Sequence, residues 1–204
     1  MVYKFDPRYF NGTIFSIDTA WEMTGDWMEY RRQSQPVPAF CFPKTLTFDG
    51  ASAELPDMFH VSRNIIVFSE RARVFVERSA PGQVEFIPVG CQAKPKIAAK
   101  LNFAIAYYFI NVLGRAQRLQ WLEMPAHKFP LRDDGTGLFG LLQDFSEWKL
   151  RDSAAGEPLI WHDTPWRAGN KEYRGHNEIL IEDVLWRKLD ANFPDQLNAL
   201  RAGE

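Results

Sequence analysis

The 204-residue chain has little cysteine, almost no net charge and no long apolar run. Its only cysteines are Cys41 and Cys91. Two thiols in a chain without a secretory signal predict reduced, structural cysteines rather than a disulfide. The first ten residues, MVYKFDPRYF, lack the apolar segment of a signal peptide, so we expect none. The longest apolar stretch, residues 103–113, is about half the length of a membrane-spanning helix. We therefore expect a cytoplasmic protein with no membrane partner.

The formal net charge is only −2, from 24 basic and 26 acidic residues. This balance provides no overall attraction for a polyanion, so we expect no nucleic-acid partner. Hydrophobic residues make up 46% of the chain and charged residues 25%, values that are typical of a folded protein and exclude disorder. The length suits one domain with a sizeable core. Seven Trp and sixteen Phe supply large flat side chains for that core or for an interface.

One local pattern occurs twice: a short apolar run that ends in Ser or an acid and then changes to helical spacing. It spans residues 64–76 (NIIVFSERARVFV) and residues 177–189 (NEILIEDVLWRKL). Each copy predicts a strand, a helix N-cap and a helix, because Ser, Asp and Glu stabilise the unpaired N–H groups of a first helical turn. Neither copy contains residues with obvious catalytic chemistry.

Other patterns predict further strands and helices along the chain. Alternating or β-branched residues predict strands at residues 13–17, 45–48, 84–89 and 107–113, with Pro88 at a sheet edge or strand end. Apolar spacing predicts helices at residues 21–32, 97–106 and 182–201, the last of them split by Pro194. Strands and helices do not alternate regularly enough for a doubly wound sheet. We therefore expect an α+β single domain over residues 1–204, with a mixed or antiparallel sheet and a C-terminal helical segment. Residues 1–40 form its N-terminal strand and aromatic segment.

The segment Gly135-Thr136-Gly137-Leu138-Phe139-Gly140 has the letters of a dinucleotide-binding fingerprint. Such a site needs a strand before it, a helix after it and an acid about 20 residues further on. Here the preceding residues 129–134 (FPLRDD) are broken by proline and carry two carboxylates that would repel a pyrophosphate. We interpret the segment as a glycine loop and expect no cofactor.

His162 and Asp163 are adjacent within the segment WHDTPW, residues 161–166. A catalytic acid–base pair is one interpretation, although neighbouring residues of an extended segment point in different directions. No Gly-x-Ser-x-Gly or reactive-cysteine motif accompanies them. None of the four histidines has the spacing of helical metal ligands, so we expect no metal site. Structural or interface roles are the main expectation, and a small hydrolase or ligand-binding pocket around His162 and Asp163 is the alternative.

Four tryptophans are candidates for contacts with a protein partner: Trp21, Trp27, Trp161 and Trp166. The first two lie in an aromatic-rich N-terminal segment, and the other two flank the histidine and aspartate just described. If exposed, they would act as hot spots, because tryptophan is enriched among the residues that dominate binding energy. The alternative is that they belong to the core or cover its edge.

Five segments, in this order, resemble one bacterial family. They are residues 65–71 (IIVFSER), 84–89 (VEFIPV), 107–113 (YYFINVL), 158–161 (PLIW) and 179–184 (ILIEDV). The shared order is similar to that of a polymorphic-toxin immunity family, immunity family eleven, which was first catalogued as a domain of unknown function. The resemblance extends from about residue 40 to residue 200, and residues 41–204 form the immunity-like region. At the last step, Glu182 stands where the family has a helix-capping Ser.

The resemblance implies a non-enzymatic protein that binds a cognate toxin and blocks it, by covering the active site or locking an inactive conformation. It supplies no catalytic residues, in agreement with the motifs above. The partner is then the toxin protein, and a few buried aromatic and Arg anchors within a sizeable interface supply the affinity. Trp21, Trp27, Trp161 and Trp166 are the expected anchors.

Overall fold

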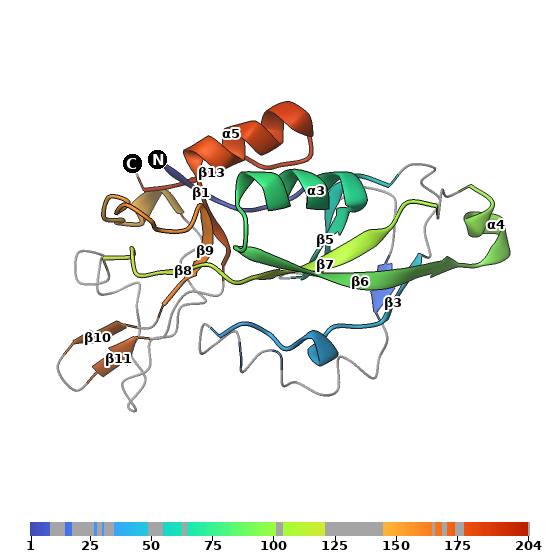
Figure 1. Cartoon of the computed structure of the whole chain (residues 1–204), viewed down its shortest axis with the longest axis horizontal. Helices are drawn as coiled ribbons and strands as arrows, with labels where there is room; N and C mark the ends of the chain where they lie inside the picture. The colour runs from blue at the N-terminus through green and yellow to red at the C-terminus, as the bar shows by residue number, and fades with distance from the viewer. Residues whose placement is uncertain are drawn as a thin grey trace.

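The protein is an α+β single domain built on two large mixed sheets and two main helices (Figure 1). The computed structural model describes residues 1–8, 15–17, 27, 30, 35–48, 55–62, 65–100, 104–120, 145–164, 166–168, 171–173 and 178–203. The two mixed sheets and the two helices confirm the expected α+β fold class. Within these residues, no helix is long and apolar enough to cross a membrane.

The larger sheet has six strands in the order β2-β3-β6-β7-β5-β4. Their bounds are β2 Phe15–Ile17, β3 Thr45–Phe48, β4 Met58–Ser62, β5 Ile65–Ser69, β6 Val84–Ala93 and β7 Tyr107–Val112. The β3–β6 pair is parallel and the other pairs are antiparallel. The strands expected near residues 13–17, 45–48, 84–89 and 107–113 are all present. Alternation of apolar side chains gives this sheet two faces that can each be covered.

The second sheet has five strands in the order β13-β1-β12-β9-β8. Their bounds are β1 Val2–Lys4, β8 Arg115–Ala116, β9 Ile160–Asp163, β12 Leu180–Glu182 and β13 Leu200–Ala202. The N-terminal strand β1 pairs with β12 on one side and β13 on the other, so the first residues of the chain complete a sheet made mostly by the last ones. A separate hairpin joins β10 Trp166–Ala168 to β11 Lys171–Tyr173.

Both predicted strand-to-helix junctions are present, and they lead into the two long helices, α3 Glu70–Ser79 and α5 Asp183–Asn192. The hydroxyl of Ser69 accepts a hydrogen bond from the backbone N–H of Ala72, as an N-cap does. At the second junction, Glu182 occupies the cap position but makes no capping hydrogen bond within the described chain. Its carboxylate is instead paired with Arg118.

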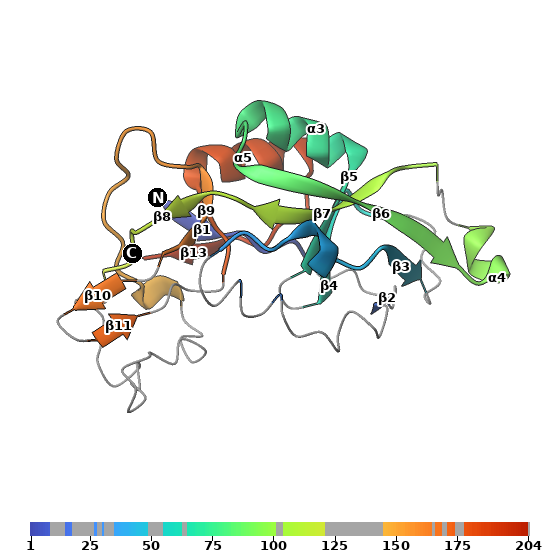
Figure 2. The ribbon, with the colours of Figure 1, turned by 60° about the horizontal axis from the view of Figure 1, so that its bottom comes forward.

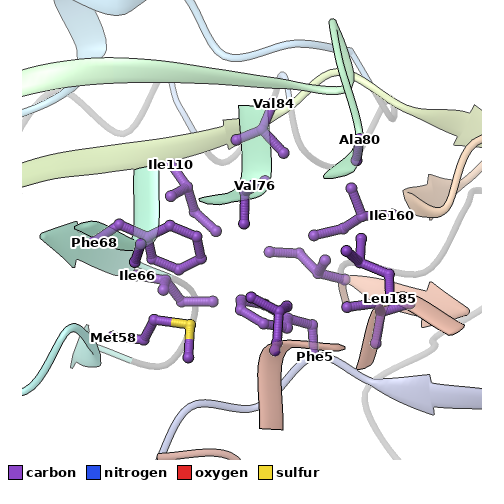
Figure 3. Packing of buried hydrophobic residues seen from close by; sticks show 14 of the residues in the cluster. Phe5, Met58, Ile66, Phe68, Val76, Ala80, Val84, Ile110, Ile160 and Leu185 are labelled. Carbon is purple, nitrogen blue, oxygen red and sulfur yellow. The ribbon is translucent and has the colours of Figure 1, made fainter. Parts of the chain in front are cut away.

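The first apolar cluster lies between the two helices and the two sheets (Figure 3). Helices α3 and α5 are side by side on one side of the molecule (Figures 1 and 2), where the rings of Phe75 and Phe193 meet edge to face at 5.6 Å. The strands and helices contribute buried side chains that include Phe5, Met58, Ile66, Phe68, Val76, Ala80, Val84, Ile110, Ile160 and Leu185. This cluster joins the two sheets into one core.

A second apolar cluster covers the opposite face of the six-stranded sheet. A strap of residues 35–44 crosses that face and includes the short 3-10 helix η1 Ala39–Cys41. Asn111 of β7 holds the strap by donating to the Val37 carbonyl at 2.8 Å and accepting from the Val37 N–H at 3.2 Å. Cys41 and Phe42 of the strap are buried in the cluster, and Cys41 and Cys91 are both thiols, as the sequence predicts.

A third apolar cluster covers the outer face of the five-stranded sheet, below the short 3-10 helix η5 Phe145–Glu147. Trp148 and Trp161 are its largest members and are almost completely buried. Along β9 the alternation is plain: Ile160 faces the first cluster and Trp161 the third. Both faces of this sheet are therefore covered near β9.

Three sequence predictions about secondary structure are wrong in part. The helix expected at residues 97–106 is only one turn, α4 Pro95–Ala98, and Ala104 and Ile105 lie in a turn and bend. The amide of Glu70 bonds to the Ala106 carbonyl at 2.9 Å, which ties the residue before β7 to the start of α3. The C-terminal helix does end before Pro194, but the part beyond it forms β13 rather than a second helix.

Pro88 lies inside a ten-residue strand rather than at its end. The amide of Gly90 bonds to the Lys44 carbonyl, so the even-numbered residues of β6 direct their backbone groups to the β3 side. Pairing with β3 begins only at Gly90, and Pro88 therefore lacks an N–H on a stretch of β6 that β3 does not reach. The predicted edge position is right, and the predicted strand end is wrong.

Candidate functional site

His162 and Asp163, the residues of the enzymatic alternative, are both buried in β9. The Nδ1 atom of His162 lies 3.1 Å from the carbonyl oxygen of Glu178. The Oδ2 atom of Asp163 accepts hydrogen bonds from the backbone N–H groups of Arg118, at 2.9 Å, and Leu119, at 3.1 Å. Adjacent strand residues point to opposite faces, and these contacts accordingly hold two different backbone segments. In this arrangement both side chains tie chain segments together.

Burial raises the pKa of Asp163 from its ordinary value of 3.8 to about 6, against the lowering effect of the two backbone donors. The side chain has no solvent exposure, so its charged form loses hydration. A carboxyl group with such a pKa can hold or release a proton near neutral pH, which is the property of a general acid or base. It is also the property of a buried structural carboxyl.

Arg118 lies beside Asp163, and its side chain is only 4% exposed. Its guanidinium forms an ion pair with Glu182 and lies 4.8 Å from the ring centroid of Trp161. Its Nε also donates to the Arg151 carbonyl at 3.2 Å. These contacts join β9, β12 and the chain after β8 into one polar cluster, in which an anion and hydrogen-bond acceptors surround the buried guanidinium. Sequence reasoning missed Arg118, because nothing local distinguishes it from a surface arginine.

The four tryptophans predicted as partner anchors have different outcomes in the structure. Trp161 is fully buried below Arg118, so its prediction as an exposed anchor is wrong. The cause is the covering of both faces of the five-stranded sheet. Trp27 has helical backbone and lies half-buried against the second cluster. Trp166 belongs to β10, and its side chain lies outside the described residues, as do all of Trp21 and the Gly135–Gly140 loop.

The described residues include another aromatic side chain with the properties expected of an anchor. Phe40, in η1, is 78% exposed, the highest value among the exposed large apolar side chains of the described chain. Its neighbours Cys41 and Phe42 are buried, and Asn111 fixes the start of the strap. A large ring that faces solvent from a fixed backbone loses little conformational entropy when a partner covers it.

The sequence contains only a weak signal for Phe40, the run PAFCFP at residues 38–43. Two prolines bracket two aromatic residues, and nothing in the run tells which ring faces inward. The contacts of Phe42 decide it, since its ring packs 5.8 Å from the ring of Phe109 in the second cluster.

Within the described ranges, no three His, Cys, Asp or Glu side chains come together in a way that could hold a metal ion. Neither a scan against protein-family models nor a search of curated proteins finds a match for this chain.

Proposed function

We propose that this protein is a non-enzymatic, cytoplasmic immunity-like protein that binds a cognate bacterial toxin and neutralises it by protein–protein contact. The ordered resemblance of its strands and junctions to the immunity family supports this proposal. The observation that carries it is Phe40, an exposed aromatic side chain on an anchored backbone. Trp21, Trp27 and Trp166 remain candidate anchors in addition to Phe40. The partner is the toxin, with no nucleic acid or membrane involved.

The strap supports a rigid mode of binding. Asn111 makes two hydrogen bonds to Val37, and the strap residues Cys41 and Phe42 are buried in the second cluster. A partner that covers Phe40 therefore gains the burial of one aromatic ring without first ordering a loop. Interface hot spots of this kind cost more than about 2 kcal/mol on truncation to alanine.

Co-expression with the toxin-like protein encoded by the neighbouring gene tests the proposal. We expect wild-type protein to restore growth, and Phe40→Ala to weaken binding of the inactivated toxin at least about thirtyfold. Val184→Ala is the matched control, because Val184 is 50% exposed on α5, and α5 and η1 lie on opposite sides of the molecule (Figure 1). Persistent killing in the presence of soluble protein contradicts neutralisation. Unchanged binding by Phe40→Ala contradicts the assigned anchor.

One observation favours the second candidate, a small hydrolase or ligand-binding protein that uses His162 and Asp163. The pKa of Asp163 is raised to about 6, and perturbed carboxyl groups are enriched at functional sites. A panel of ester and phosphoester substrates tests this candidate. Turnover that disappears in both His162→Gln and Asp163→Asn, while both variants remain folded, would replace the binding proposal.

A further inference from the structure

Three exposed lysines, Lys94, Lys96 and Lys100, follow the end of β6, and a fourth exposed lysine, Lys44, directly precedes β3. Strand β6 extends beyond its partner β7, which pairs with it only as far as Val89. The single turn α4 follows β6 at the end of this arm, far from α3 and α5 (Figures 1 and 2). We call α4 with Lys94, Lys96 and Lys100 the basic tip.

None of the four ammonium groups has a carboxylate partner in the described chain, and the same holds for the exposed Arg78, Lys149 and Lys188. Elsewhere, ion pairs join Arg71 to Asp57, Arg73 to Glu70 and Glu77, Arg118 to Glu182, Arg151 to Glu157, and Arg187 to Asp183. The sequence explains part of this contrast. Residues 86–122 contain five Lys or Arg and no Asp or Glu. The positive charge of the tip is therefore not neutralised by its sequence neighbours.

The basic tip and the strap that carries Phe40 pack against the same apolar cluster. Ile97 of α4 packs against the second cluster, which contains Cys41 and Phe42 on the two chain positions after Phe40. Lys44 is the last residue of the strap, and its carbonyl accepts from the Gly90 amide of β6 at 2.9 Å. An exposed aromatic ring and positive charge that no carboxylate of the described residues pairs therefore flank one apolar cluster.

We propose that the basic tip recognises an acidic protein surface, so that the toxin places Asp and Glu side chains against α4 while an apolar site receives Phe40. This inference rests on the proposed function. Complementary charge at the rim of an interface speeds association and selects the partner. Apolar neighbours favour a protein over nucleic acid. Four lysines can neutralise about four phosphates, fewer than the roughly 6–10 phosphate contacts of proteins whose duplex binding depends steeply on salt.

The test uses fluorescein-labelled peptides and the full-length protein. One peptide alternates Asp and Glu with Leu and Phe, and its counterpart carries Asn and Gln instead of the acids. An oligonucleotide duplex of equal charge is the third probe. The tip variant is Lys94→Glu, Lys96→Glu and Lys100→Glu together. The matched control is Arg78→Glu, Lys149→Glu and Lys188→Glu, which makes the same change in net charge at exposed positions elsewhere.

We expect the wild-type protein to bind the acidic peptide better than its neutral counterpart. The tip variant should bind it at least about tenfold more weakly at low salt, and the control variant should not. The difference should shrink as salt rises, because the screening length is about 10 Å at 0.1 M. Circular dichroism verifies that both variants fold.

Several results would overturn the inference. These are no binding of the acidic peptide, equal binding of the neutral peptide, equal losses in the two variants, or tip-dependent binding of the duplex that exceeds that of the peptide. Growth rescue by a protein whose tip does not bind the acidic peptide would sink this inference alone. If the acidic peptide binds through the tip but the protein does not rescue growth, the proposed function is contradicted and this inference is not.

Discussion

Replacement of Asp163 by Asn removes a buried titrating group from β9 without changing the shape of the side chain. The amide oxygen can still accept from the backbone N–H groups of Arg118 and Leu119, which now bond to Oδ2 at 2.9 Å and 3.1 Å. In the wild-type protein, burial raises the pKa of Asp163 from 3.8 to about 6. The native state therefore binds this proton more tightly than the unfolded chain does.

The sign of the effect follows from proton linkage. A carboxyl group whose folded pKa is raised contributes stability that is fully present below the unfolded pKa and is lost as pH rises through the folded pKa. A difference of about two pKa units corresponds to about 3 kcal/mol in total. Between pH 5 and pH 7 the protonated fraction of the native carboxyl falls from about nine-tenths to about one-tenth. The free energy of unfolding should fall by about 1 kcal/mol in this interval because of Asp163 alone.

Urea unfolding of wild-type protein and Asp163→Asn at pH 5, 6 and 7 measures this contribution. Histidines titrate in the same range, but the difference between the two curves cancels any contribution that they share. The pKa values of Asp6 and Asp57 are lowered by hydrogen bonds that outweigh their burial, so both groups titrate below this range. Relative to wild type, the variant should gain about 1 kcal/mol between pH 5 and pH 7. If the two curves of unfolding free energy against pH are parallel, the reasoning is refuted, because Asp163 then has the same pKa in the folded and unfolded states.

Two further substitutions test the packing of the second sheet. Gly114→Ala should destabilise the protein by more than about 4 kcal/mol, because a Cβ atom there would lie 2.0 Å from the Ile160 carbonyl oxygen. Gly82→Ala is its control: nothing lies within 4 Å of the added atom, and only the positive φ of 72° costs energy, about 1 kcal/mol. Equal losses in thermal unfolding would contradict the close approach. Glu182→Ser introduces a capping side chain worth about 1 kcal/mol but leaves the buried Arg118 without its carboxylate, at a cost of about 3–5 kcal/mol. The variant should therefore unfold at lower urea, and a gain in stability would show that the ion pair contributes little.

The two strand-to-helix junctions were predictable because their signals are local. Ser69 follows a run of buried apolar residues and caps α3 with its own hydroxyl. At the second junction the same pattern predicts α5 correctly, but it does not predict the role of Glu182. That side chain turns to Arg118, which lies in a different part of the sequence. A local pattern specifies where a helix begins, and long-range contacts specify what the first residue does.

The wrong predictions have a common physical origin. Residues 195–201 have apolar spacing that suits a helix, yet β13 pairs with the edge of β1, since backbone hydrogen bonds at an open strand are available only after the chain ends meet. The end of the segment after α4 is tied to the start of α3 by the bond between Glu70 and Ala106. Propensity is a weak preference, and tertiary hydrogen bonds override it.

The candidate site was harder to predict than the fold. Tryptophan content indicated that an aromatic anchor is plausible, but it did not distinguish Trp161, which is buried, from Phe40, which is exposed. The sequence also shows no ordered run of basic residues near α4. Only the structure shows that β6 extends beyond β7 and carries Lys94 and the turn α4 at its end.

By itself, the sequence determined the α+β class, most strands and the starts of both long helices. These features depend on side-chain alternation and capping within a few residues. The tertiary structure alone decided that Trp161 is covered, that Arg118 and Glu182 are paired, and that the strap that carries Phe40 and the basic tip pack against one apolar cluster. The reason is that burial and charge pairing depend on which sheet faces meet. In this protein those faces are assembled from the two ends of the chain, where β1 pairs with β12 and β13.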